Sequence, residues 1–302
     1  MKKPGGKKTF RAGFVAILGR PNAGKSTLLN QLLGTKLAIV AAKPQTTRVA
    51  IEGVLNLPEA QIAFIDTPGI HKGETALNRH MMRAVRHAAD APDVVLFVID
   101  ALAKVTEQDA QAVSLVKNIA APAIAVINKI DWLKEKPKII EVIEKYRALH
   151  DFAAYVPVSA RKGDGVEHLV NEILTHLPKG PALFPEDYVT DQPGRFLAAE
   201  VIREKVLHHT EQEVPHSVAV VIEEWEELPK LLRISAAILV ERPGQKAILI
   251  GAGGAMLKKI GTLARRELEK LFARKVFLQT FVKVQNGWRE DPAFLSAVDW
   301  RQ

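Results

Sequence analysis

Residues 19–26 read Gly19-Arg20-Pro21-Asn22-Ala23-Gly24-Lys25-Ser26, which fits the pattern G-x-x-x-x-G-K-[S/T]. The apolar run at 14–18 predicts a strand before this segment, and residues 28–33 predict a helix after it. Glycines between a strand and a helix let backbone N–H groups surround a phosphate, and the helix N-terminus adds positive potential. The segment, with Thr27 after it, therefore predicts a phosphate-binding loop in which Lys25 reaches the terminal phosphates and Ser26 binds Mg²⁺.

The chain after this loop alternates between strand and helix patterns. Apolar runs of strand length lie at 62–65, 94–99 and 124–127, and helical spacing of apolar residues lies at 77–89, 107–118 and 138–149. Buried strands that alternate with helices are typical of a mostly parallel sheet with helices on both faces, an α/β fold. Four prolines and two glycines between 178 and 194 then predict a linker.

Beyond the linker the pattern changes to an α+β order. Residues 196–209 predict a helix, and 218–224 and 233–240 predict strands. We interpret 247–254 as a strand that enters a glycine-rich turn. A basic amphipathic helix at 256–272 and a strand at 276–284 follow. The sequence therefore predicts a second domain with a different architecture.

Composition excludes several classes of protein. The 302 residues are 47% hydrophobic and 25% charged, which excludes a largely disordered chain, and the lack of cysteine excludes disulfides and thiolate chemistry. No apolar run approaches the roughly 20 residues of a membrane-spanning helix. No apolar segment follows the N-terminal lysines as it would in a secretory signal, so we expect a cytoplasmic protein.

The net charge of +8 is unevenly distributed. Residues 241–289 contain eleven Lys or Arg against three Glu. Such a stretch indicates either a basic face for a phosphate polymer or an ordinary solvated helix face, and charge alone does not choose between them.

Three further motifs follow predicted strands. Asp66-Thr67-Pro68-Gly69 places an acid where Mg²⁺ is reached and a glycine whose N–H can meet the γ-phosphate. In Asn128-Lys129-Ile130-Asp131, the Asp131 carboxylate can accept the two adjacent N–H donors of guanine, which adenine lacks. The backbone of Ser159-Ala160 can meet the guanine O6.

Four motifs in this order make the chain resemble the small GTPases of the P-loop superfamily over residues 12–178. The resemblance implies GTP and GDP binding, Mg²⁺ and hydrolysis, with Lys25 and Gly69 at the reaction. It also implies that Thr47, within Lys43-Pro44-Gln45-Thr46-Thr47-Arg48, closes on the Mg²⁺ held by Ser26 and Asp66.

One position departs from the Ras-like pattern. Ile70 stands where such enzymes carry a water-orienting glutamine. GTPases with a hydrophobic residue there include some that use K⁺ held partly by an asparagine of the phosphate loop. Asn22 matches that asparagine, so we hypothesise stimulation by K⁺.

The second half resembles a KH domain, because a G-x-x-G turn at 251–254 precedes a basic helix. In KH domains this turn clamps single-stranded RNA. Ala252 and Gly253 depart from the polar residues that are usual there, which would weaken the clamp or shift it to neighbouring lysines. The RNA-binding residues that we predict are Lys246, Ile250, Gly251, Ala252, Gly253, Gly254, Lys258, Lys259, Arg265 and Arg266.

The whole arrangement resembles the Era family of bacterial GTPases. We divide the chain into a flexible basic N-terminus (1–11), a G domain (12–178), a linker (179–193) and a KH-type domain (194–302). The resemblance implies a monomer that binds the 3′ end of 16S rRNA, assists assembly of the small ribosomal subunit and associates peripherally with the inner membrane. Three alternatives are a tRNA-modification GTPase, which the missing cysteine argues against, an RNA chaperone with little turnover, and a membrane-associated signalling GTPase.

Overall fold

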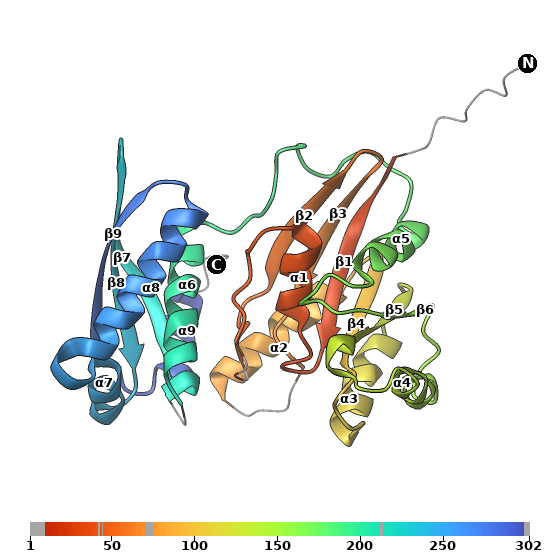
Figure 1. Cartoon of the computed structure of the whole chain (residues 1–302), viewed down its shortest axis with the longest axis horizontal. Helices are drawn as coiled ribbons and strands as arrows, with labels where there is room; N and C mark the ends of the chain where they lie inside the picture. Colours follow the sequence, from red (N-terminus) through yellow and green to blue (C-terminus); the bar gives the residue numbers. More distant parts are fainter. Residues whose placement is uncertain (1–9, 42, 44, 71–74, 212–213, 299–302) are drawn as a thin grey trace, which may run out of the picture. The chain divides into compact units, whose positions relative to one another are not determined.

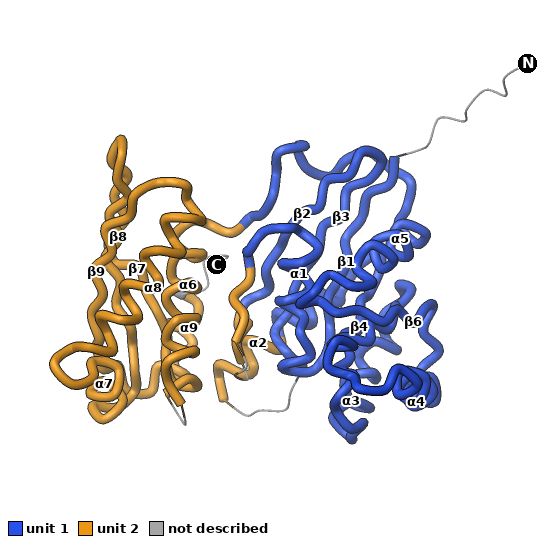
Figure 2. The backbone as a smooth tube through the Cα atoms, viewed as in Figure 1, with its two compact units in different colours: residues 1–37, 49–71, 83–191 blue, residues 38–48, 72–82, 192–302 orange. Residues whose placement is uncertain are grey.

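The computed structural model describes residues 10–41, 43, 45–70, 75–211 and 214–298. The chain forms two compact units, which Figure 2 colours separately. The first comprises residues 1–37, 49–71 and 83–191, and the second comprises 38–48, 72–82 and 192–302. Most of the predicted basic N-terminus lies outside the described residues. The second unit thus includes two segments, 38–48 and 72–82, that come from within the range predicted for the G domain.

The first unit contains a six-stranded sheet (Figure 1), with strand order β2-β3-β1-β4-β5-β6. β2 pairs antiparallel with β3, and the other neighbours are parallel. β5 is buried along its whole length, as expected for a strand that is covered on both faces. The predicted α/β fold is confirmed. The strands are β1 (Arg11–Gly19), β2 (Ile51–Leu57), β3 (Ala60–Asp66), β4 (Val94–Asp100), β5 (Ala123–Asn128) and β6 (Ala154–Pro157).

Helices connect the strands of this unit. Neither β2 nor α5 is among the elements predicted from the sequence. Because β1, β3 and β5 run parallel, their carboxyl ends lie at one edge of the sheet, and the predicted motifs follow these ends. The helices are α1 (Lys25–Leu33), α2 (Ala76–Ala89, of which residues 76–82 belong to the second unit), α3 (Glu107–Lys117), the 3-10 turn η1 (Ile130–Trp132), α4 (Lys138–Arg147) and α5 (Val166–His176).

The second unit has a three-stranded sheet of order β7-β8-β9, in which β7 and β8 are antiparallel and β8 and β9 are parallel. One buried cluster joins α6 and α8 to the sheet, and it includes Ile39 from the segment 38–48. A second cluster surrounds Trp288 and includes Leu77 and Met81. The elements are α6 (Gly194–His209), η2 (Val214–His216), β7 (Ala219–Leu228), β8 (Leu231–Val240), α7 (Pro243–Ile250), η3 (Ala252–Gly254), α8 (Ala255–Leu271), β9 (Lys275–Val284), η4 (Trp288–Glu290) and α9 (Pro292–Val298).

The strand predicted at 247–254 is wrong. Residues 243–250 form α7, and the glycine turn lies between two helices. Pro243 at the first turn and Gly251 after the last are typical of a helix start and stop. The apolar run at 247–250 is too short for periodicity to separate a strand from a helix.

A membrane-spanning helix must be both long and apolar. In the part of the chain that the structure describes, no single helix is long and apolar enough to cross a bilayer. α7 and residues 252–271 pass only as a pair, which is bent by 47°.

Candidate functional site

The phosphate loop joins the end of β1 to the start of α1. Gly24 has φ 96°, a left-handed conformation, and Lys25 begins the helix directly after it. The ammonium of Lys25 donates to the carbonyl of Arg20 at 3.1 Å. Burial lowers the pKa of Lys25 to about 8, against the attraction of Asp66. An anion placed in this loop would favour the charged ammonium.

The acid after β3 meets the first turn of α1. The Ser26 hydroxyl donates to Asp66 Oδ2 at 2.7 Å, and Asp66 is fully buried. Thr67 donates to the carbonyl of Ile17 at 2.8 Å, which fixes the chain as it leaves the strand. A hydroxyl and a carboxylate are hard oxygen ligands that suit Mg²⁺ together with substrate phosphates. The two residues therefore fit the metal that the sequence predicts.

The glycine of this motif lies against the phosphate loop. Ile70 N–H donates to the carbonyl of Gly19 at 3.1 Å. A Cβ at Gly69 would lie 2.6 Å from the backbone nitrogen of Pro21, so only glycine allows this approach. Ile70 is buried and carries no polar group that could orient water.

Asn128 connects three of the predicted motifs. Its Nδ2 donates to the carbonyl of Ala23 at 2.9 Å, and its Oδ1 accepts from the N–H of Ala160 at 3.0 Å. Asn128 also explains the glycine at position 24, because a Cβ there would collide with Nδ2. The phosphate loop and the Ser159-Ala160 loop are thus held by one buried side chain.

The predicted base-reading carboxylate is held on both oxygens. Ser159 Oγ donates to Asp131 Oδ1 at 2.8 Å, and Arg161 Nη2 donates to Oδ2 at 2.9 Å. Burial alone would raise the pKa of Asp131, but the Ser159 hydrogen bond and the Arg161 charge outweigh it and lower the pKa. The ammonium of Lys129 lies 2.6 Å from Asp100 Oδ2. The Asp131 carboxylate is therefore ionised, and its two hydrogen bonds fix its orientation.

A second network anchors the phosphate loop from outside. Arg20 Nη1 donates to Asp109 Oδ2 at 2.7 Å, and Asp109 belongs to the capping box of α3. Tyr146 donates to the other oxygen, Oδ1, at 2.7 Å. Asp109 is buried, and these bonds with those from Thr106 outweigh desolvation and lower its pKa.

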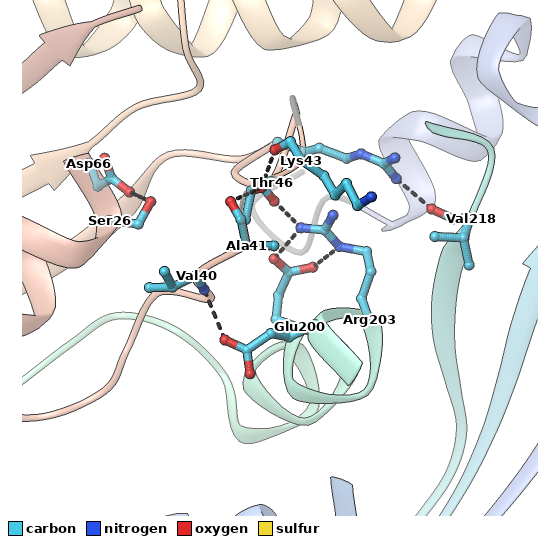
Figure 3. A network of polar contacts seen from close by, with 11 residues as sticks. Ser26, Val40, Ala41, Lys43, Thr46, Asp66, Glu200, Arg203 and Val218 are labelled. Atoms are coloured by element: carbon cyan, nitrogen blue, oxygen red, sulfur yellow. Dashed lines mark hydrogen bonds and ion pairs between the residues drawn. The ribbon is translucent and has the colours of Figure 1, made fainter. Parts of the chain in front are cut away.

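The segment that carries Thr47 lies in the second unit, where α6 holds it (Figure 3). Glu204 accepts from the N–H of Val40 at 2.9 Å. Arg203 donates to the carbonyl of Thr46 and also forms an ion pair with Glu200 at 2.7 Å. The structure thus brings Ser26 and Asp66 together in one unit and places Thr47 in the other.

Arg48 follows Thr47 and is held by the same unit. Its Nη1 donates to the carbonyl of Val218 at 2.7 Å, and its guanidinium lies 5.4 Å from the ring centroid of Trp288. Burial, together with the charge of Arg203, lowers the pKa of Arg48 to about 9. Burying a cation costs free energy, which the Val218 hydrogen bond and the Trp288 contact offset in part.

The predicted RNA turn is built of glycines with positive φ. Gly251, Gly253 and Gly254 have φ 70°, 56° and 81°. A Cβ at Gly251 would lie 2.8 Å from Cβ of Met256, whereas nothing lies near Gly253 or Gly254. Lys246 and Ile250 belong to α7, and the other predicted cations belong to α8. Lys258, Lys259 and Arg266 are exposed, while Arg265 forms an ion pair with Glu269 at 2.9 Å.

Family models match both halves of the chain. A model described as a 50S ribosome-binding GTPase matches residues 14–129, and a KH domain model matches 213–289. The chain is 49% identical to the GTPase Era of Geobacter metallireducens over 96% of this chain and 98% of that protein. It is 46% identical to the GTPase Era of Stenotrophomonas maltophilia over 94% and 96%. The chain belongs to the Era family of GTPases.

Solved Era structures have the same fold. An Era complex with MgGDPNP and nucleotides 1506–1542 of 16S ribosomal RNA superposes with a TM-score of 0.93, at 43% identity, over 95% of this chain and 98% of that chain. A variant of Aquifex aeolicus Era bound to GDP.AlF4- gives a TM-score of 0.92 at 43% identity, with the same coverage. The predicted resemblance to the Era family is confirmed.

Sequence reasoning missed the side chains that hold the motif residues. Asp100 contacts Lys129, Arg161 contacts Asp131, and Asp109 contacts Arg20. Two of these had a signal in the sequence. Arg161 directly follows Ser159-Ala160, and Asp109 completes a capping box with Thr106.

Proposed function

We propose that this chain is a GTP-hydrolysing switch that binds the 3′ end of 16S rRNA through its KH domain and assists assembly of the small ribosomal subunit. The observation that carries the nucleotide part is Asn128, which joins the phosphate loop to the loop beside Asp131. The Era complex with a GTP analogue and 16S rRNA nucleotides supports the RNA part. We propose a monomer in the cytoplasm.

At the reaction centre, the chain's own groups bind and orient the nucleotide. Ser26 and Asp66, which lie within hydrogen-bond distance of each other, would hold Mg²⁺, and the ion would supply charge neutralisation at the phosphates. Lys25 contacts the terminal phosphates, and the N–H of Gly69 meets the γ-phosphate. Asp131 accepts the two guanine donors, with Ser159 keeping its orientation.

We assign K⁺ as a second cation near Asn22. Asn22 is exposed, and it has a positive φ of 62° within the phosphate loop. Ile70 has no polar side chain that could orient the attacking water from that position, so an added cation would supply the charge that an arginine finger supplies elsewhere. We expect faster GTP hydrolysis in K⁺ than in Na⁺ buffer at equal ionic strength. Equal initial rates, or an Asn22→Ala variant that keeps the K⁺ effect, would exclude this role.

The switch works through the segment 38–48. Its contacts with Glu204, Arg203 and Val218 belong to the RNA-binding unit, whereas GTP with Mg²⁺ draws Thr47 to the nucleotide. We infer that the nucleotide state changes these contacts of the segment within the RNA-binding unit. By linkage, RNA changes GTP affinity by the same factor.

The test is a titration of a single-stranded RNA that copies the 3′ end of 16S rRNA, with GDP and with a non-hydrolysable GTP analogue at fixed salt. Tighter binding with the analogue supports the coupling. Arg203→Ala removes one anchor of the segment and should reduce the difference between the two nucleotide states. Equal affinity in both states of the unaltered chain would remove the coupling and leave the RNA target.

Two alternatives remain as outcomes of further assays. A multiple-turnover assay with and without RNA separates a switch from an RNA chaperone that scarcely hydrolyses GTP. Sedimentation with vesicles of anionic lipid, with and without residues 1–11, tests peripheral membrane contact through the basic N-terminus.

A further inference from the structure

Arg161 lies at the base-reading end of the nucleotide site. Its Nη2 donates to Asp131 Oδ2 at 2.9 Å, and its guanidinium lies 4.8 Å from the ring centroid of Trp132. Ser159 occupies the other oxygen of Asp131 at 2.8 Å. Both oxygens that guanine needs are therefore already accepting hydrogen bonds from the protein.

The two partners of Asp131 differ in how freely they can move. Ser159 is fully buried, and its Oγ also accepts the N–H of Lys162 at 3.2 Å. The Arg161 side chain is 59% exposed, while that of Asp131 is only 2% exposed. Each carboxylate oxygen can accept a second hydrogen bond, so the Ser159 bond leaves capacity for guanine, but a side chain that is only 2% exposed must first be uncovered. Arg161 is the partner with room to move.

An exposed guanidinium on a buried carboxylate suits such an exchange. The exposed guanidinium of Arg161 can return to water at little cost, and guanine offers Asp131 two donors in its place, so guanine can displace the arginine. A bare buried carboxylate is costly, so Arg161 lowers the barrier for the base to leave, because it replaces the lost donors. Trp132 keeps the guanidinium beside Asp131 through a cation–π contact.

We infer that Arg161 is an intramolecular competitor of guanine for Asp131, and that it promotes release of the bound nucleotide. The inference rests on the proposed guanine site. Removing Arg161 should therefore slow nucleotide dissociation, whereas removing a residue that merely supports the site would speed it.

The test follows dissociation of a fluorescent GDP analogue, chased with excess GDP. Arg161→Ala should slow dissociation roughly two- to fivefold, because the competing donor is absent. Arg161→Lys retains a cation and should recover part of the rate. Lys162→Ala removes the same charge one residue away, without an Asp131 contact, and should leave the rate unchanged.

The outcomes are distinguishable. Slower release in Arg161→Ala, with Lys162→Ala unchanged, supports the inference. Unchanged or faster release in a folded Arg161→Ala protein overturns it, and thermal unfolding verifies the fold. The unaltered chain is tested first for binding of GDP over ADP, because loss of that preference would refute the proposed guanine site itself.

Discussion

The phosphate loop at 19–26 and the glycine turn at 251–254 both place glycines of positive φ directly before a helix, yet their surroundings differ. Gly24 lies against the Asn128 side chain, in a loop that is tied to neighbouring loops by buried hydrogen bonds. Gly253 has open space around it. The first loop is shaped before its ligand arrives. The second presents backbone and exposed lysines that a flexible RNA strand can adapt to.

The largest expected effect comes from Gly24→Ala. The new Cβ would collide with Asn128 Nδ2 and would adopt a φ of 96°, which alanine disfavours. Backbone strain of ~1–3 kcal/mol and the loss of a buried hydrogen bond, ~1–3 kcal/mol, together predict at least a roughly 30-fold loss of GDP affinity by calorimetry. Gly253→Ala is the matched control and should leave GDP affinity unchanged. Similar losses of GDP affinity in both variants would contradict the proposed difference between the two loops.

Asn128→Ala should have the next largest effect. It removes the bonds to Ala23 and Ala160 and leaves two buried backbone groups without their partner. At ~1–3 kcal/mol for such a loss, GDP affinity should fall roughly 10- to 100-fold. The melting temperature of the protein should fall with it. A variant with unchanged GDP affinity would show that the loops hold their shape without this side chain.

The double variant Lys258→Ala, Lys259→Ala tests the open turn. Both lysines are exposed at the start of α8, so their removal should leave the melting temperature and GDP affinity unchanged. RNA affinity should fall several-fold, and the slope of log affinity against log salt should decrease by about 0.7 for each RNA phosphate that the protein no longer neutralises. An unchanged slope would mean that the RNA backbone lies elsewhere.

The smallest expected effect is the uptake of a proton by Lys25 when the nucleotide binds. The pKa of Lys25 is lowered to about 8, whereas phosphates require the charged ammonium. GDP binding at pH 8 should therefore take up about half a proton, and affinity should weaken as pH rises above 8. Calorimetry in two buffers of different ionisation enthalpy measures the uptake. Lys25→Arg stays charged and should show none from this position.

The same pKa has a consequence for the free protein. Because the folded pKa lies below the usual 10.5, the unfolded chain binds more protons between pH 8 and 10.5. The contribution of Lys25 to folding stability therefore rises with pH across this window, whereas nucleotide affinity falls.

Local patterns were enough to predict the sheet of the first unit apart from β2, and the positions of its motifs. The apolar run at 94–99 forms β4, Asp66 and Asn128 end β3 and β5, and Ser159 follows β6. The turn at 251–254 lies where the sequence predicts it. The segment before it is a helix rather than the predicted strand, because a run of four apolar residues fits either period.

The contacts that hold the site are long-range, and no local pattern predicts them. Asp100 reaches Lys129, and Asn128 reaches back to Ala23, only after the strands have paired. The same holds for the segment 38–48. Its packing on α6 depends on residues more than 150 positions away in the sequence, such as Arg203 and Glu204.

The second unit is assembled from three separate stretches of the sequence, 38–48, 72–82 and 192–302. It therefore cannot complete its core until the end of the chain has been synthesised. Ile39, Ala76, Leu77 and Met81 are buried members of its clusters, and residues 192–302 supply the other buried members. At about 5–20 residues per second, translation from residue 82 to the end takes roughly 10–40 s. During this time these four apolar side chains lack their native partners. Nascent chains of this protein therefore present a defined set of apolar groups to chaperones until the last helices leave the ribosome.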